Sequence, residues 1–189
     1  MFSLKRLNKL YHIASLLKRF ISFEVKGSMV STGPVLGATA YITHTFDQTS
    51  VNTFSQIYGD NNPIHLDEEY AKKTMFGKPI IHGMLASSLF STIFGRTIHS
   101  SVYINQTLTF RAPIYINTPV KAQIEIIKID KKSRGYFINC TTKCYIPNNN
   151  TINDGNNNDA SNKEVVAIDG EATVLIPLEK YEALMKAHT

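Results

Sequence analysis

The 189 residues suit a single folding unit with its own core, and a content of 43% hydrophobic and 19% charged residues excludes a largely disordered chain. No stretch reaches the roughly 20 consecutive apolar residues of a membrane-spanning helix, which argues against an integral membrane protein. The formal net charge is +5, but residues 1–27 hold six basic residues and one acidic one; subtracting them from the 20 basic and 15 acidic residues leaves 14 of each. This balance argues against a nucleic-acid-binding surface, which needs basic contacts to phosphates.

The first 30 residues differ in composition from the rest of the chain. They carry serines and no acidic residue before Glu24, and their apolar residues recur at helical spacing: Leu7, Leu10, Ala14 and Leu17. A basic, acid-poor, amphipathic segment is typical of a mitochondrial transit peptide, although a basic helix on an anionic membrane surface has the same pattern. We therefore expect residues 1–30 to be a targeting segment, residues 31–189 to form one domain, and the protein to act in the mitochondrial matrix.

Short elements are predicted ahead of residue 83. Residues 38–47 alternate and are rich in β-branched side chains, which predicts a strand. Asp47, Thr49 and Ser50 offer N-cap choices for a short helix that runs through Tyr58. Residues 59–63 are dense in turn formers and predict a loop, and residues 67–73 predict a further helical piece.

A long helix and several strands are predicted for the second half of the chain. Residues 83–98 have apolar side chains around most of the helix circumference, which indicates a buried helix. Strand patterns follow at residues 101–111, 119–130, 135–146 and 164–177, and residues 178–187 are consistent with a terminal helix. One buried helix followed by consecutive strands, with no βαβ alternation, predicts an α+β fold in which an antiparallel sheet wraps around a central helix.

Two features interrupt the strand pattern. Residues 147–162 contain eight Asn in 16 positions and little apolar surface, which predicts a flexible loop insert. Cys140 and Cys144 are four residues apart in a predicted strand, so their side chains point to the same face and do not readily form a disulfide. We expect two buried thiols at these positions and no metal site.

The loop Gly59-Asp60-Asn61-Asn62-Pro63-Ile64-His65 places a carboxylate and an imidazole five residues apart. Such a pair, held close, can grip a water molecule and transfer protons, because the carboxylate orients the imidazole or stabilises its charged form. The same residue types also populate ordinary turns, so this segment alone leaves a structural turn as the alternative.

A second motif, Ile80-Ile81-His82-Gly83-Met84, stands directly before the predicted long helix. The start of a helix presents unpaired N–H groups and the positive end of the helix dipole. Gly83 has no side chain to keep a substrate oxygen from its N–H, as the stabilisation of an oxygen that develops negative charge requires. The alternative is a glycine selected for close packing, and His82 fits a packing or capping role as well as an active one.

The segment Phe54–Gly95 resembles the hydratase-2 motif region of the MaoC-like dehydratases, a family that includes the (R)-specific enoyl-CoA hydratases. The resemblance lies above all in Tyr58–Asp67 (YGDNNPIHLD) and Pro79–Leu85 (PIIHGML). The similarity extends more loosely to about Pro177. The resemblance implies a hot-dog fold, normally assembled as a homodimer. It also implies that water is added to trans-2-enoyl thioesters, or removed from (3R)-hydroxyacyl thioesters, with no metal or redox cofactor.

The resemblance assigns a role to each matching residue. Asp60 and His65 match the catalytic pair, and Gly83 matches the backbone N–H donor of the oxyanion site. Asn62 matches the residue that braces the catalytic loop. Ser91 matches a serine of the central helix near the substrate, although packing alone also explains a small residue there.

The resemblance and the targeting segment together favour dehydration of acyl-carrier-protein thioesters in mitochondrial fatty acid synthesis, with acyl carrier protein as partner. The alternatives are an (R)-specific enoyl-CoA hydratase of fatty acid degradation and a non-catalytic acyl-thioester-binding protein. A hot-dog thioesterase would not need the motif around Asp60 and His65. The small residues 86–88 of the long helix are expected to leave room for the acyl tail.

Overall fold

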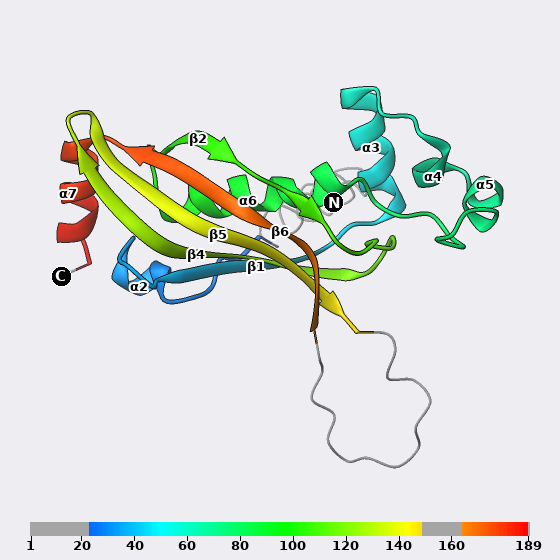
Figure 1. Cartoon of the computed structure of the whole chain (residues 1–189), viewed down its shortest axis with the longest axis horizontal. Helices are drawn as coiled ribbons and strands as arrows, with labels where there is room; N and C mark the ends of the chain where they lie inside the picture. The colour runs from blue at the N-terminus through cyan, green and yellow to red at the C-terminus, as the bar shows by residue number, and fades with distance from the viewer. Residues whose placement is uncertain (1–22, 149–163, 189) are drawn as a thin grey trace, which may run out of the picture.

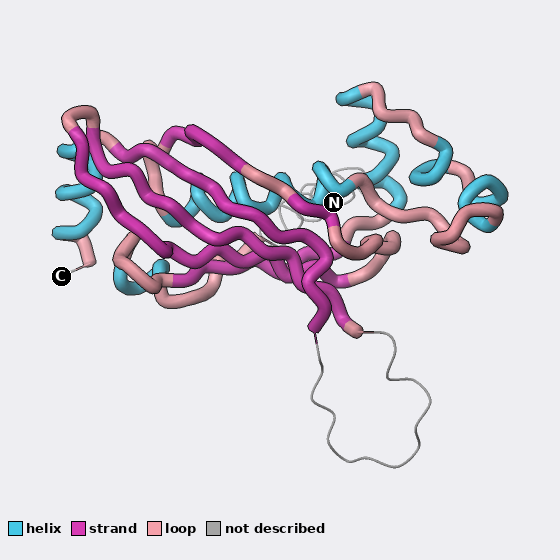
Figure 2. The backbone as a smooth tube through the Cα atoms, viewed as in Figure 1, coloured by secondary structure: helices cyan, strands magenta, loops and turns pink. Residues whose placement is uncertain are grey.

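The computed structural model describes residues 23–148 and 164–188. Its strands form one antiparallel sheet in the order β1-β4-β5-β6-β2, and β3 also pairs with β6. The strands are β1 (Thr39–Thr45), β2 (Val102–Gln106), β3 (Thr109–Phe110), β4 (Pro119–Lys132), β5 (Gly135–Pro147) and β6 (Glu164–Ile176). Figures 1 and 2 show this curved sheet wrapped around helix α6 (Gly83–Thr97), which agrees with the predicted α+β architecture.

Helix α6 packs one apolar face against β1, β4 and β5. Its large side chains that face the sheet are at most 2% exposed: Leu89, Phe90, Ile93 and Phe94. Full burial of a side chain of this size contributes roughly 1.5–3 kcal/mol, so this face holds the helix to the sheet. The opposite face is exposed at Met84, Ser88, Ser91 and Gly95. The prediction of a helix buried nearly all round is therefore wrong for this face, which small and polar residues dominate.

The other helices of the described residues lie at the two ends of the sheet (Figure 1). Helices α3 (Gln48–Tyr58), α4 (Pro63–Leu66) and α5 (Glu68–Lys72) follow one another beyond one end. Helices α2 (Met29–Thr32) and α7 (Leu178–Lys186) lie at the other end. The structure confirms the predicted helices that correspond to α3, α5, α6 and α7, whereas α4 is a single helical turn that the sequence did not predict.

The strands after α6 are confirmed with one break. Residues 101–111 form β2 and β3 instead of one continuous strand. The chain between them crosses so close to Gly170 of β6 that a Cβ there would overlap the main chain of Thr107. The pairing of β2 with β6 also shifts register between Tyr103 and Asn105. Close approach to a neighbouring strand at a glycine therefore interrupts the predicted strand.

Residues 23–30, the part of the first 30 residues that the structure describes, already belong to the packed structure. Lys26 pairs with Tyr41 of β1, and Met29 is only 1% exposed within the core. These residues therefore pack on the strand and the core of the predicted domain.

Other predictions fall partly outside the described residues. The predictions for residues 1–22 and for the Asn-rich residues 149–163 concern segments that the structure does not describe. Cys140 and Cys144 are buried and unbridged, and burial raises the pKa of each thiol to about 12, which confirms two buried thiols. Within the described ranges, no helix is long and apolar enough to cross a membrane.

Candidate active site

A glycine in the left-handed region turns the chain from α3 into the loop that carries Asp60. Gly59 has a φ of 76° and donates its N–H to the carbonyl oxygen of Ser55 at 2.8 Å, which ends the helix. Residues with a Cβ rarely adopt this conformation. The Asp60 carboxylate then accepts a hydrogen bond from the N–H of Asn62 at 3.3 Å, and the side chain stays 52% exposed. The loop thus presents this carboxylate to the solvent side of the site.

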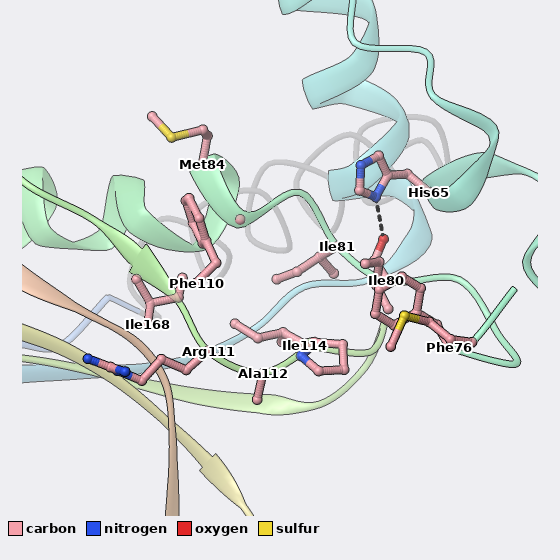
Figure 3. A pocket seen from close by; sticks show the side chains of 13 residues that line it. His65, Phe76, Ile80, Ile81, Met84, Phe110, Arg111, Ala112, Ile114 and Ile168 are labelled. Carbon is pink, nitrogen blue, oxygen red and sulfur yellow. Dashed lines mark hydrogen bonds between the residues drawn. The ribbon is translucent and has the colours of Figure 1, made fainter.

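Helix α4 positions His65. The side-chain oxygen of Asn62 accepts from the N–H of Ile64 at 3.3 Å, and Pro63 occupies the first helical position. The half-buried His65 ring then approaches the carbonyl oxygen of Ile80, at 2.8 Å from Nδ1 (Figure 3). Because a carbonyl only accepts, Nδ1 carries the hydrogen and Nε2 of the neutral ring keeps a free lone pair. The ring is held in the form that takes up a proton at Nε2.

His82 lies between the Asp60 loop and His65. Its ring is 2% exposed, and its Nε2 lies 3.1 Å from the carbonyl oxygen of Asp60 and 3.9 Å from the carboxylate oxygen Oδ2. The His65 and His82 ring centroids are 3.8 Å apart. Burial lowers the pKa of His82, and the hydrogen bond to Asp60 opposes this shift. His82 is therefore a neutral ring that touches both predicted catalytic residues.

Gly83 opens α6 beside this group. No hydrogen bond donated by its N–H is found among the described residues, as expected for the first turn of a helix. A Cβ at this position would lie within 2.6 Å of Cδ1 of Phe110, so the Phe110 ring occupies the space that a side chain would need. Close packing against Phe110 therefore requires a glycine here, and the same residue also has an N–H available at the positive end of the helix.

Two cavities meet at Gly83. One, of about 590 Å³, is bordered by Asp60, His65, Gly83 and Ser91. The other, of about 460 Å³, is also bordered by His65 and Gly83 and is otherwise almost entirely apolar. Figure 3 shows Phe110 at the edge of this second cavity, on the side of α6. A substrate that spans the junction would lie beside both the imidazole and the helix N-terminus.

The structure thus brings four of the five predicted site residues to one cavity. Asn62 does not border this cavity, and its side chain instead supports the loop through the hydrogen bond that begins α4. Of the small residues expected to make room for an acyl tail, Ser87 and Ser88 border the larger cavity, whereas Ala86 is fully buried and borders neither.

The sequence did not identify Phe110 or the part that His82 plays. Phe110 belongs to a strand 27 residues after Gly83, and no local pattern connects the two residues. His82 carried one signal, its place next to Gly83, but only the fold brings its ring against His65.

Asp60, His65 and His82 are also the group of described residues best placed for a metal ion. Each offers one ligand atom, and these atoms lie within 4.8 Å of one another. Metal binding uses a nitrogen lone pair, but Nε2 of His82 already donates to the carbonyl oxygen of Asp60. A metal ion at this group would have to break that bond or use the buried Nδ1, so the arrangement suits proton transfer better.

Comparison with known proteins agrees with this chemistry. The family model of the MaoC like domain matches residues 31–143. The chain is 30% identical over 162 residues to the mitochondrial 3-hydroxyacyl-[acyl-carrier-protein] dehydratase of Arabidopsis thaliana. This match covers 86% of this chain and 87% of that protein. It is 33% identical over 150 residues to the 3-hydroxybutyryl-CoA dehydratase of Methylorubrum extorquens, and this match covers 78% of this chain and 83% of that protein.

A solved structure gives the same result for the fold. The (R)-hydratase from A. caviae involved in PHA biosynthesis matches with a TM-score of 0.64 and 28% sequence identity, over 77% of this chain and 98% of that one. This likeness confirms the predicted hot-dog fold.

Proposed function

The chain belongs to the MaoC-like dehydratase family and is a hydro-lyase of 3-hydroxyacyl thioesters, and from this premise we propose that Asp60 and His65 are its acid–base pair. The substrate would be a (3R)-hydroxyacyl thioester, which loses the proton at C2 and the hydroxyl at C3 to give a trans-2-enoyl thioester and water. The observation that carries the proposal is the convergence of three groups on one cavity: the Asp60 carboxylate, the His65 imidazole and the helix start at Gly83.

The bond between His65 and Ile80 supports a role for His65 in proton transfer. Since Nδ1 donates to the Ile80 carbonyl oxygen, the neutral ring has its lone pair at Nε2 and takes up a proton there. The carboxylate of Asp60, near the same point, stabilises the imidazolium and orients the hydroxyl or water. During dehydration the pair takes the C2 proton and returns a proton to the departing hydroxyl, so that water leaves and the pair is restored.

Removal of the C2 proton shifts negative charge onto the thioester oxygen. The N–H of Gly83 stands at the N-terminus of a 15-residue helix, where the helix dipole adds to the hydrogen bond. A donor of this kind contributes about 10²–10³ in kcat in other enzymes. Ser91, which borders the same cavity on the next turns of α6, would contact the substrate and not the reacting atoms.

We further propose acyl carrier protein as the natural carrier and the mitochondrial matrix as the location. The mitochondrial relative of Arabidopsis thaliana and the basic composition of residues 1–30 support this choice. The relative of Methylorubrum extorquens, named for a CoA substrate, supports the alternative, an (R)-specific enoyl-CoA hydratase. Measuring kcat/KM for one acyl group on both carriers decides between them: a higher value for the carrier-protein thioester is expected, and a higher value for the CoA thioester would favour the alternative.

A homodimer is the proposed assembly. Strand β2 stands at the end of the sheet order, and its Val102 and Ile104 are 55% and 51% exposed. Met84 on the open face of α6 is 58% exposed. An edge strand with exposed apolar residues is a common site of association with another chain, so these features support pairing with a second copy.

The function is tested with the full chain by following the hydration of a short trans-2-enoyl-CoA and analysing the stereochemistry of the product. We expect a (3R)-hydroxy product, and we expect Asp60→Asn and His65→Gln each to lower kcat by about 10²–10⁴ while the variants stay folded. His99→Gln, an exposed histidine just beyond the far end of α6, is the matched control and should keep full activity. A folded protein that turns over neither CoA nor carrier-protein thioesters would contradict the proposal.

A further inference from the structure

His82 has more polar chemistry than a packing residue needs. Its side chain is 2% exposed, and its Nδ1 is buried with no hydrogen-bond partner in the described part of the chain. A phenylalanine ring would fill a similar space and could stack on the neighbouring Phe54 and His65 rings without burying an unpaired nitrogen. The presence of an imidazole must therefore be explained by its other nitrogen.

That nitrogen, Nε2, ties the start of α6 to the loop after α3. It lies 3.1 Å from the carbonyl oxygen of Asp60 and 3.4 Å from the hydroxyl oxygen of the buried Ser55. Since the carbonyl can only accept, Nε2 carries the hydrogen and Nδ1 is the unprotonated nitrogen. The bond spans 22 residues of sequence and holds the main chain at Asp60 in place.

The ring of His82 also supports His65. The two ring planes are inclined by 34° with centroids 3.8 Å apart. When His65 takes up a proton, a charged ring at this distance would repel it, whereas a neutral ring would not. Asp60 and His65 are the titratable groups that act on His82, and burial, the largest influence, lowers its pKa and keeps it neutral.

We propose that His82 is a positioning residue for the acid–base pair: its Nε2–H fixes the main chain of Asp60, and its neutral ring fixes the plane of His65. His82 exchanges no proton with the substrate in this account. Because it directly precedes Gly83, the same residue aligns the pair with the helix N-terminus. The inference rests on the proposed function of Asp60 and His65.

Three substitutions separate the roles of the ring and of its nitrogens. The amide nitrogen of Gln reaches the position of Nε2, the amide nitrogen of Asn reaches only that of Nδ1, and Phe keeps the ring and loses both nitrogens. We expect His82→Gln to keep kcat within about 10-fold, and His82→Asn and His82→Phe to lose about 100-fold in kcat with little change in KM, because misplacement by about 1 Å costs about that much.

The contrast between these variants decides the result. Equal kcat in His82→Gln, His82→Asn and His82→Phe would overturn the inference, as would a loss that appears in KM alone. Thermal unfolding of each variant shows whether a lost activity reflects an unfolded protein.

A measurement on the unmodified protein makes the test independent of variants that fail to fold. Nitrogen NMR of His82 should show a neutral ring with the hydrogen on Nε2 at pH 7 and above, because burial lowers the pKa of His82 from the ordinary histidine value. A ring protonated on Nδ1, or a charged ring near pH 7, would overturn the inference.

Asp60→Asn and His65→Gln in the same assay separate this inference from the proposed function. Loss of activity in both, with His82→Asn and His82→Phe still active, would refute the role of His82 alone. Full activity of Asp60→Asn and His65→Gln would refute the proposed function, and the role of His82 with it.

Discussion

Gly83→Ala probes the point where the two cavities and the helix N-terminus meet. The new Cβ would lie within 2.6 Å of Cδ1 of Phe110, well inside the contact distance of about 3.5–4.0 Å. Phe110 is 53% exposed, so its ring can move outward to make room. The unfolding free energy should therefore fall by only about 1 kcal/mol, the lower limit of what overpacking typically costs. The displaced ring changes the junction of the cavities, and we expect kcat/KM to fall about 10-fold, equivalent to about 1.4 kcal/mol.

Phe110→Ala removes the atoms that this Cβ would meet. In the double variant we therefore expect Gly83→Ala to have almost no further effect, which corresponds to a coupling free energy of about 1 kcal/mol. Urea denaturation gives the unfolding free energy and the hydration assay gives kcat/KM for the four proteins of the cycle. Single effects that add to within about 0.5 kcal/mol would refute the contact, because additivity is the behaviour of residues that do not touch. An activity loss that persists in the double variant would refute the assigned cause and point to obstruction of the Gly83 N–H itself.

Three further predictions concern the loop, the core and the sheet edge. Asn62→Ala removes the hydrogen-bond acceptor that begins α4, so the unfolding free energy should fall by about 1 kcal/mol and kcat should fall with it. Asn62→Ser keeps an acceptor and should lose less of both. Equal losses in the two variants would contradict the capping role. Burial raises the pKa of the Cys140 and Cys144 thiols to about 12 from 9.0, so the folded protein should resist thiol reagents near pH 8. Its unfolding free energy should also fall as the pH rises from 9 towards 12, because unfolded thiols lose protons that the native state retains; rapid labelling of folded protein would show that the thiols are accessible. Ile104→Lys puts a charge on the exposed edge strand β2 and should shift the protein towards monomer in light scattering with unchanged circular dichroism; an unchanged dimer would exclude β2 from the interface.

The sequence predicted the elements whose patterns are local. The long helix is expected at 83–98 and observed at Gly83–Thr97, and the strands expected at 119–130 and 135–146 are observed as β4 and β5, which pair with each other. The break between β2 and β3 had no local signal, because it arises where the chain crosses Gly170 of another strand. In the same way, the packing of residues 23–30 depends on a distant strand, while their composition indicated only a basic leader.

The candidate site shows the same division between local and tertiary information. Asp60 and His65 could be predicted as candidates from their spacing and their resemblance to a family motif, because both lie within one short loop and helical turn. The tautomer of His65 could not be predicted, since it depends on a carbonyl oxygen 15 residues further along the chain.

The segment from Ile80 to Gly83 explains why the two motifs specify a site only in combination. The carbonyl oxygen of Ile80 accepts from His65 Nδ1, and the N–H of Ile80 donates to Ile64 at 3.3 Å. The next residue, Ile81, donates its N–H to Ile114 at 2.8 Å and is buried, which anchors the segment to the body of the domain. His82 then reaches Asp60, and Gly83 begins the helix. Four consecutive residues thus determine the tautomer of His65, anchor the segment to the domain, hold the Asp60 loop and place the N–H of Gly83. An insertion of one residue here would break the alignment of these contacts even if Asp60 and His65 were kept, so the spacing within the second motif is as necessary to the site as the pair in the first.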